Sequence, residues 1–318
     1  MELQEIRTLC GNIRENINRV IVGKEDVIDH LLIAMVASGH ILLEDVPGTG
    51  KTMLAKSAAK SIDCTFKRIQ FTPDLLPSDL TGINYYDQKA GEFRFRPGAV
   101  FTNILLGDEI NRATPRTQSA LLECMEERQV SIDGVTTKLS SPFMVIATQN
   151  PVETQGTFPL PEAQLDRFLI KTGMGYPSTE DGANILARFQ EENPLDTIEP
   201  VASASDLIDA QRSFTTVHVA RSMLAYIVQI AEETRRHTDV VLGVSPRGTQ
   251  ALLKTAQVHA ILAGRDFITP DDVKAMVGPV FGHRIILKSS ARVKKGLNFE
   301  ILDAILSRVA VPTEDLDR

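Results

Sequence analysis

The sequence contains few cysteines, no long apolar run and no excess of positive charge. Its three cysteines, Cys10, Cys64 and Cys124, lie far apart and form no Cys-x-x-Cys pair, which argues against a disulfide framework or a zinc ribbon. The longest uninterrupted apolar run, Leu31 to Ala37, is much shorter than a membrane span, and the polar N-terminus does not have the pattern of a signal peptide. These absences predict a cytoplasmic protein without a membrane span.

The charge balance is acidic, with 34 Lys and Arg against 41 Asp and Glu and a formal net charge of −7. This balance argues against nucleic acid or an anionic membrane as the main partner, although it leaves room for a local basic patch. Apolar residues make up 43% of the 318 residues, which is typical of a globular chain with a sizeable core. At about 150 residues per domain, the length predicts roughly two domains.

Residues 1–175 alternate helical patterns with short apolar runs, which predicts an α/β fold with a parallel sheet covered by helices on both faces. The predicted strands are Ile41–Glu44, Arg68–Phe71, Asn103–Asp108, Phe143–Thr148 and Phe168–Thr172.

Two stretches interrupt this alternation with the pattern of β-hairpins. Residues 129–139 alternate around Asp133-Gly134, and residues 83–96 alternate around a turn that contains glycine. On the residues alone, each hairpin could be a simple surface ribbon.

After residue 175 the composition changes, and we expect residues 176–318 to form a small all-helical domain without sheet strands. Ser245-Pro246 and Thr269-Pro270 each place a capping residue before a proline at the first helical position. Gly264 is a plausible end for the helix that begins after Ser245.

A glycine-rich loop follows the first predicted strand and precedes a helix, which is the order that a phosphate-binding loop requires. Its glycines let backbone N–H groups face phosphate oxygens at the positive end of the helix, Lys51 is expected to reach the β- and γ-phosphates, and the Thr52 hydroxyl to bind Mg²⁺. Asp45 stands where the strict pattern G-x-x-x-x-G-K-[ST] has glycine. The residues of the loop that we expect to contact ATP are Val46, Pro47, Gly48, Thr49, Gly50, Lys51, Thr52 and Met53.

Polar residues end two of the other predicted strands. Asp108 and Glu109 follow the strand that begins at Asn103; we expect Asp108 to hold Mg²⁺ and Glu109 to polarise the attacking water. Asn150 follows the strand that begins at Phe143. If that strand lies between the strand that precedes the glycine-rich loop and the strand that ends in Asp108, the Asn150 amide would orient the water beside the γ-phosphate. An Asn before Pro151 is also a common turn residue.

Two arginines are candidates for contact with the negative charge that develops during phosphoryl transfer, a contact worth about 10³ to 10⁵ in rate. Arg167 precedes the last predicted strand, and Arg247 occupies the second position of the helix after Ser245. A cation in a first helical turn, as Arg247 is, interacts unfavourably with the helix dipole unless an anion is near. Either arginine could equally form a salt bridge with a neighbouring carboxylate.

With these motifs in place, the chain resembles the MoxR family of AAA+ ATPases over essentially its whole length. The segments that carry the resemblance are ILLGDEINRA (104–113), PRTQSALLE (115–123), ATQNP (147–151) and FPLPEAQLDRF (158–168). The resemblance implies a P-loop NTPase core at 1–175, a helical lid domain at 176–318, and ATP and Mg²⁺ as cofactors.

The resemblance also implies several residue roles. Val22 and Gly23, in VIVGK (20–24), match the segment that contacts adenine. Arg167 matches the arginine finger, which acts on the ATP of the next subunit, and Arg247 matches the lid arginine that holds the γ-phosphate. The two hairpins match insertions that face the centre of a ring.

A finger that acts between subunits implies a homo-oligomer, and the family forms hexameric rings. Members are thought to be chaperone-like motors that mature partner protein complexes, whose components often carry a von Willebrand factor A domain. Three alternatives stay open: a nucleic-acid motor, for which Phe93 to Arg96 would supply a short basic and aromatic surface; a metal-chelatase motor subunit; and a nucleotide-gated scaffold, which would not need Glu109.

Overall fold

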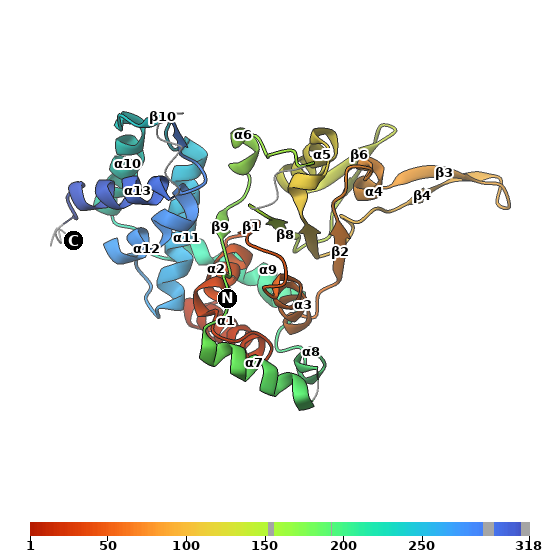
Figure 1. The fold of residues 1–318 in the computed structure, drawn as a ribbon, viewed down its shortest axis with the longest axis horizontal. Coiled ribbons are helices and arrows are strands. Elements are labelled where there is room, and N and C mark those ends of the chain that lie inside the picture. The colour runs from red at the N-terminus through yellow and green to blue at the C-terminus, as the bar shows by residue number, and fades with distance from the viewer. Residues whose placement is uncertain (152–155, 192, 289–295, 313–318) are drawn as a thin grey trace.

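The computed structural model describes residues 1–151, 156–191, 193–288 and 296–312. Its centre is a five-stranded parallel sheet in the order β2-β5-β8-β1-β9 (Figure 1). The strands are β1 (Ile41–Glu44), β2 (Phe66–Gln70), β5 (Ile104–Asp108), β8 (Met144–Gln149) and β9 (Ile170–Thr172). All five strands predicted for the core are therefore confirmed, with ends that differ by at most two residues.

The register of β8 places the polar strand ends together. β8 pairs with β5 from Ile104↔Met144 onward and with β1 as far as Glu44↔Gln149. Because all these pairs are parallel, the carboxyl ends of β1, β5 and β8 meet at one edge of the sheet. The condition set for the role of Asn150 is therefore met, because β8 lies between β5 and β1.

Burial along the strands follows their place in the sheet. β5 is buried at all five positions and β8 at five of six, whereas β2 at the edge is largely exposed. The expectation of burial on both faces is therefore wrong for β2. Its Lys67, Arg68 and Gln70 are polar because an edge strand has one side open to solvent.

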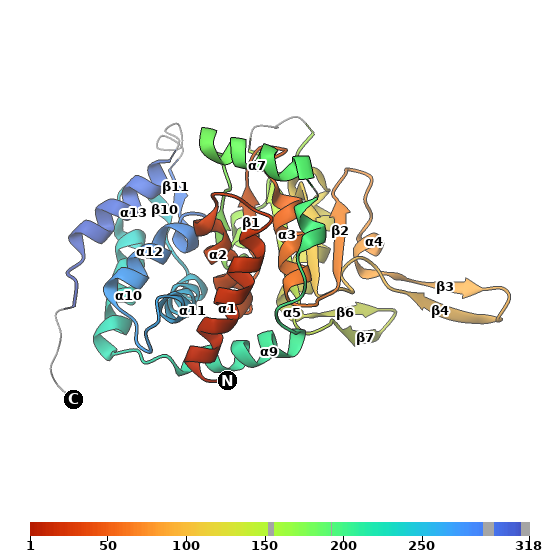
Figure 2. The same cartoon turned by 90° about the horizontal axis from the view of Figure 1, so that it is seen from below.

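The central strands alternate between two apolar clusters, one on each face of the sheet. Ile41 and Leu43 of β1 belong to a cluster with helices α1, α2 and α3, whereas Leu42 belongs to a cluster with α5. Figure 2 shows α1, α2 and α3 on the near side of the sheet. The helices of the first part of the chain are α1 (Leu3–Asn18), α2 (Glu25–Val36), α3 (Lys51–Ser61), α4 (Pro77–Thr81), the 3-10 turn η1 (Ile110–Arg112), α5 (Pro115–Glu127) and α6 (Glu162–Leu165).

Both hairpin predictions are confirmed. β3 (Ile83–Asp87) and β4 (Glu92–Arg96) form an antiparallel ribbon that projects from the body of the molecule (Figure 1). β6 (Gln129–Ile132) and β7 (Val135–Lys138) form the second ribbon, and both of its turn residues, Asp133 and Gly134, have positive φ, as a tight two-residue hairpin turn requires.

The later part of the chain is helical, as expected. The N-cap of α11 is Ser245, whose hydroxyl accepts a hydrogen bond from the Gly248 N–H, and Gly264 follows the helix with φ +80°. Thr269 and Asp272 form the capping box of α12. These helices are α7 (Thr179–Glu191), α8 (Pro194–Thr197), α9 (Ala204–Ser213), the 3-10 turn η2 (Phe214–Thr216), α10 (Arg221–Arg236), α11 (Pro246–Leu262), α12 (Pro270–Phe281) and α13 (Leu297–Arg308).

One expectation for this part is wrong, because it does contain strands. β10 (Val240–Leu242) and β11 (Ile286–Leu287) form a short antiparallel ribbon, too short to show an alternating pattern in the sequence. α10 to α13 lie beside the β9 edge of the sheet, far from the β3–β4 ribbon (Figure 1), whereas α8 contacts α3 and α9 contacts α1 and α2. The division of the chain near residue 175 stays a prediction.

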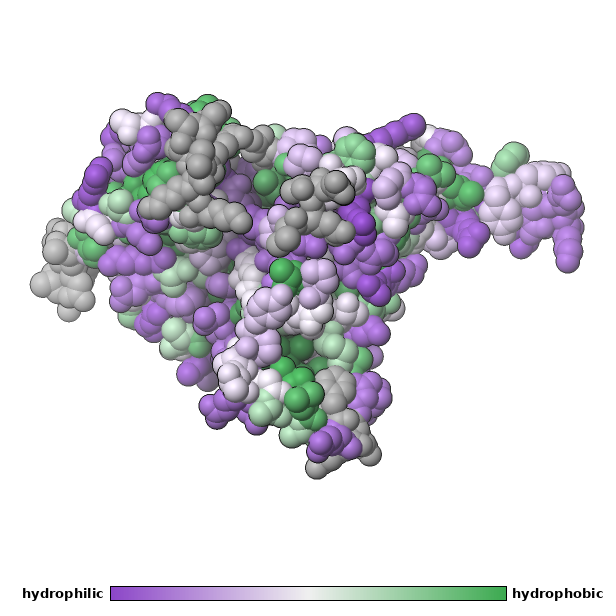
Figure 3. All heavy atoms as spheres, viewed as in Figure 1, coloured by the Kyte–Doolittle hydropathy of each residue, from purple (hydrophilic) through white to green (hydrophobic). Residues whose placement is uncertain are grey.

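Within the part of the chain that the structure describes, no helix combines the length and the apolar character needed to cross a membrane. On the face shown in Figure 3, apolar residues gather in small areas separated by hydrophilic residues.

Candidate functional site

The glycine-rich loop connects β1 to α3 and closes around a small cavity. Gly48 and Gly50 have φ of +82° and +93°, a region that other residues rarely adopt, and α3 begins at Lys51 immediately after Gly50. A Cβ at Gly48 would meet no atom within 4 Å, so the backbone angle and not a lack of space requires glycine there. The loop thereby presents the N-terminus of α3 to the cavity, an arrangement that binds anions.

The cavity, of about 250 Å³, brings together most of the predicted phosphate and magnesium residues. Lys51 lines this cavity, and its ammonium group folds back onto the loop that precedes it. There it donates hydrogen bonds to the carbonyl oxygens of Val46 at 2.6 Å and of Asp45 at 3.3 Å. The predicted site residues that line the cavity are Pro47, Gly48, Gly50, Lys51, Thr52, Met53, Asp108, Glu109 and Asn150.

A second, mainly apolar cavity of about 290 Å³ adjoins the first. Gly48, Gly50 and Met53 line both cavities, and Thr49 and Val22 line the second one. Its other lining residues are Val20, Ile21, Lys24, Met174, Pro177 and Ile185. A flat apolar ring beside a phosphate cavity would fit this arrangement.

Within the phosphate loop and the segment predicted to contact adenine, two residues line neither cavity, Val46 and Gly23. Val46 takes part through its carbonyl oxygen, which holds Lys51. Gly23 follows Val22 with φ +66°, and a Cβ there would overlap the carboxylate of Asp181 on α7. Gly23 therefore lets the segment before α2 approach α7 closely, which forms one wall of the apolar cavity.

Asp108, at the end of β5, is held by two partners that the sequence analysis did not identify. Its Oδ1 accepts a hydrogen bond from the Thr148 hydroxyl at 2.7 Å, and its Oδ2 forms an ion pair with Arg68 of β2 at 2.7 Å. Thr148 Oγ1 also accepts a hydrogen bond from the Glu109 N–H at 2.9 Å. One buried hydroxyl thus fixes the positions of both acidic residues.

Glu109 has an unusual backbone, with φ +57° in the left-handed region, which costs a non-glycine residue about 1 kcal/mol or more. Its carboxylate accepts hydrogen bonds from the Gln70 amide at 2.9 Å and from Arg112 at 3.1 Å. The Gln70 contact joins the ends of neighbouring strands β2 and β5 and could have been found only once their order was known. Asn150, at the end of β8, lines the same cavity and is 9% exposed.

Asp45, the departure from the strict loop pattern, has a defined structural role. Asp45 is 8% exposed, and one of its carboxylate oxygens accepts a hydrogen bond from the Val46 N–H and the other from the Gly175 N–H, each at 2.8 Å. Glycine could not make this link. Asp45 therefore ties the start of the phosphate loop to the segment that leads from β9 toward α7.

Arg167 and Arg247 lie together at another place in the molecule. Arg167 precedes β9, so it lies at the amino end of the strands, opposite the phosphate loop. Arg247, at the start of α11, forms an ion pair with Glu126, and Arg167 approaches the same carboxylate at 4.0 Å. Neither arginine lines the phosphate cavity of its own chain, and both line a third cavity of about 280 Å³.

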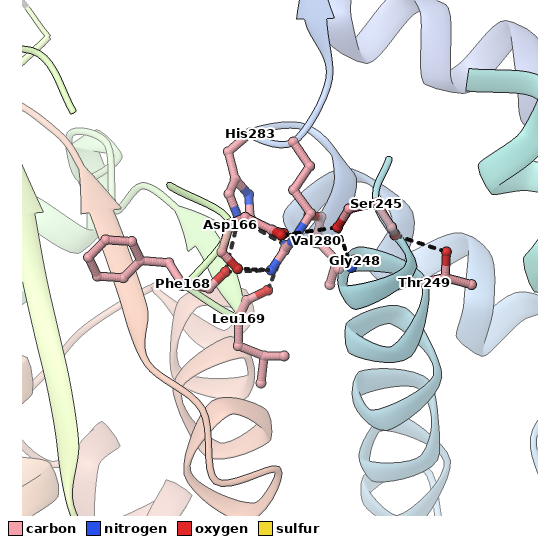
Figure 4. Close-up of polar contacts among 9 residues, drawn as sticks. Asp166, Phe168, Leu169, Ser245, Gly248, Thr249, Val280 and His283 are labelled. Atoms are coloured by element: carbon pink, nitrogen blue, oxygen red, sulfur yellow. Dashed lines mark hydrogen bonds and ion pairs between the residues drawn. The ribbon is translucent and has the colours of Figure 1, made fainter. Parts of the chain in front are cut away.

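A buried network beside these arginines joins β9 to the helical part of the chain (Figure 4). The Arg284 guanidinium is almost fully buried, forms an ion pair with Asp166 at 2.7 Å and donates to the Phe168 and Leu169 carbonyl oxygens. The other Asp166 oxygen accepts a hydrogen bond from the Ser245 hydroxyl at 3.0 Å. Because Asp166 precedes Arg167 and Ser245 caps the helix that carries Arg247, this network fixes both arginines relative to each other.

Comparison with known proteins agrees with this geometry. Residues 40–170 match the family described as "ATPase family associated with various cellular activities (AAA)", and residues 232–305 match the AAA lid domain. The chain is 51% identical to the uncharacterised protein YeaC of Bacillus subtilis, over 98% of this chain and 97% of that protein. It is 39% identical to Chaperone MoxR1 of Mycobacterium tuberculosis, over 97% of this chain and 83% of that protein.

A solved structure has the same fold. The crystal structure of a protein from Cytophaga hutchinsonii superposes with a TM-score of 0.90 at 37% identity, covering 97% of this chain and 96% of that one.

Proposed function

The chain belongs to the MoxR family of AAA+ ATPases, and from this premise we propose that it hydrolyses MgATP in a ring of identical subunits and uses the resulting movement to remodel partner proteins. The observation that carries the proposal is the convergence of Lys51, Thr52, Asp108, Glu109 and Asn150 on one cavity, from three separate strand ends.

The residues of the cavity fit MgATP. The loop around Gly48 and Gly50 directs a helix N-terminus at the cavity, which suits phosphate oxygens, and the apolar cavity next to it suits the adenine ring. Asp108 and the Thr52 hydroxyl supply the oxygen ligands that Mg²⁺ prefers. A bound Mg²⁺ would neutralise charge on the phosphates.

The protein groups have separate roles in this proposal. Lys51 leaves the carbonyl oxygens of its own loop and pairs with the terminal phosphates. Glu109 accepts a hydrogen bond from the attacking water at Oε1, because Gln70 and Arg112 both donate to its Oε2. Asn150 orients the same water without adding charge. Thr148 keeps Glu109 and Asp108 in place during these steps.

The position of Arg167 supports a site shared between subunits. It lies at the amino end of β9, whereas its own phosphate loop follows the carboxyl end of β1, and β1 and β9 are parallel neighbours. Arg247 lies beside Arg167 at the same end, and in our proposal both arginines act on the ATP of the adjacent subunit. Such a heterologous contact closes into a ring, which we propose is a hexamer.

Steady-state phosphate release tests the reaction. The specific activity should rise with protein concentration as subunits assemble, and Glu109→Gln should bind ATP yet turn over at least about a hundredfold more slowly. The matched control is Glu123→Gln, on the exposed side of α5, which should behave as the wild type. A turnover rate that is unaffected by Glu109→Gln would show that the proposed site is not catalytic.

The partner is proposed from the family, whose member MoxR1 is named a chaperone. We propose a protein client, with a von Willebrand factor A domain protein as the first candidate. Affinity capture with Glu109→Gln in ATP, compared with the same variant in ADP, should retain the client only in ATP. Equal capture in both nucleotides would contradict an ATP-driven cycle of client binding.

A further inference from the structure

One carboxylate, that of Glu126, contacts both of the arginines that the proposed function assigns to the neighbouring ATP. Glu126 lies in the last turn of α5, and its two oxygens face Arg247 on one side and Arg167 on the other. A negative charge in the last turn of a helix opposes the helix dipole. The ion pair with Arg247 and the approach of Arg167 offset this unfavourable charge at Glu126.

Three of the other charged groups of the cavity, Arg128, Arg284 and Asp166, have partners of their own, and the fourth, Lys254, is exposed. Arg128 donates to the carbonyl oxygens of Ser38 and Phe143. Arg284 and Asp166 form the buried ion pair that fixes β9 to the lid. Among the described residues that line the cavity, Asp166 and Glu126 are the carboxylates, so Glu126 is the one that offsets the charge of Arg167 and Arg247.

We propose that Glu126 occupies, in the free subunit, the place that the neighbouring subunit's γ-phosphate takes on the Arg167 and Arg247 pair when the ring assembles. This inference rests on the proposed function. Glu126 is a positioning residue: it holds the two guanidinium groups together before assembly and must release them afterwards.

The geometry of the contacts suits a group that is exchanged. The side chains are 48% exposed for Arg247, 31% for Arg167 and 35% for Glu126, and the Arg167 contact is a loose one at 4.0 Å. Ion pairs of this exposure contribute little to stability. A terminal phosphate carries more charge than a carboxylate and offers more oxygens to two guanidinium groups, so it can displace Glu126.

Removing the carboxylate should therefore make assembly with ATP easier. In Glu126→Gln the arginines are no longer neutralised, and the protein concentration for half-maximal ring assembly should fall about twofold to tenfold, the range that one or two exposed ion pairs cover. With ADP, which lacks the γ-phosphate, the shift should be at most half as large on a logarithmic scale. Turnover per subunit at saturating protein concentration should stay within about twofold of the wild type.

The experiment is sedimentation velocity across a protein dilution series in ATP and in ADP, with each variant built on Glu109→Gln so that ATP persists. The matched control is Glu127→Gln, which removes the adjacent exposed carboxylate from the same helical turn. Circular dichroism checks that both variants keep the fold. Phosphate release is measured separately on chains that retain Glu109.

The sedimentation series separates support for the role of Glu126 from its refutation. The proposal is supported if Glu126→Gln lowers the protein concentration for half-maximal assembly in ATP, if the decrease is smaller in ADP, and if Glu127→Gln shows no decrease. The proposal is overturned if the protein concentration for half-maximal assembly is unchanged or higher, or if it shifts equally in ATP and in ADP. A large loss of turnover at saturating protein also overturns it, because Glu126 would then orient the arginines in the assembled site. If the parent protein neither assembles nor hydrolyses ATP, the proposed function fails and the role of Glu126 fails with it.

Discussion

Replacing Arg284 with Met should destabilise the protein strongly and loosen the attachment of the lid to the sheet. Arg284 is the central donor of a buried network: it forms an ion pair with Asp166 and donates to four backbone carbonyl oxygens, those of Asp166, Phe168, Leu169 and Val280. Methionine fills part of the same volume and donates no hydrogen bond. Burial lowers the pKa of Arg284, and the neighbouring Asp166 offsets part of that shift, so the pair compensates in part for the cost of a buried charge.

The magnitude follows from these contacts. Removing one partner of a buried ion pair costs about 3 to 5 kcal/mol, because the other charge keeps its burial and loses its partner. Asp166 keeps the Ser245 hydroxyl and is partly exposed, which favours the lower half of that range. The carbonyl oxygens that lose a donor add about 1 kcal/mol each where water does not replace it. We expect a loss of about 4 kcal/mol in the free energy of unfolding.

Urea unfolding followed by circular dichroism measures this loss. The matched control is Arg236→Met on α10, where the arginine is 68% exposed and pairs with Glu232 and Glu233; it should cost less than about 1 kcal/mol. Arg284→Lys, which keeps the charge but not the planar fork of donors, should fall between the two. If Arg284→Met lies within about 1 kcal/mol of the wild type, the network does not hold the lid and the estimate above is refuted.

Three further predictions concern the loop, the acidic pair and a buried histidine. Asp45→Gly restores the strict loop pattern but removes the bond to the Gly175 N–H, so hydrogen exchange at that amide should accelerate by about tenfold or more, and an unchanged rate would contradict the link. Thr148→Val removes the hydroxyl that holds Asp108, and turnover should fall roughly 10- to 100-fold with little change in the ATP dissociation constant; normal turnover in a phosphate-release assay would be evidence against this role. Burial lowers the pKa of His40 to about 3, so the unfolded chain binds its proton below pH 6.5 while the folded chain does not; this contribution to stability is complete above pH 6.5 and falls by about 1.4 kcal/mol per unit as the pH drops toward 3. In His40→Gln, the free energy of unfolding in urea, measured between about pH 4.5 and 6.5, should lose this contribution to its pH dependence. An identical pH dependence in the variant and the wild type would count against a neutral buried His40.

Local signals in the sequence were sufficient for most of the sheet and for the phosphate cavity. The apolar runs that end in Glu44, Asp108 and Gln149 mark the central strands because each run lies between helical segments, and parallel strands bring their carboxyl ends to one edge. The Asp133-Gly134 pair marked the second hairpin because its backbone angles match a tight turn. These features depend on a few adjacent residues, which a sequence shows directly.

The rest depends on contacts between distant residues, which the sequence does not show. Arg284 meets Asp166 across more than a hundred positions, and nothing near either residue indicates the other. The position of Arg247 in a first helical turn made it a candidate, and the family resemblance supplied its lid role, but no local pattern indicates that it lies beside Arg167 on Glu126. The hydrogen bond from Gln70 to Glu109 could be predicted only from the order of the strands, because the two residues lie on neighbouring strands β2 and β5.

A mixing experiment tests the shared site most directly. Arg167→Ala and Glu109→Gln should each be nearly inactive alone, because one lacks the arginine for its neighbour and the other lacks the group that polarises water. If Arg167 acts on the adjacent subunit, an Arg167→Ala chain next to a Glu109→Gln chain forms one complete site, and random equimolar rings should recover about a quarter of the wild-type phosphate release. Recovery near that level, lost when the subunits are kept dilute, is what the account predicts. A mixture as inactive as its two components, under conditions where mixed rings are shown to form, would contradict it.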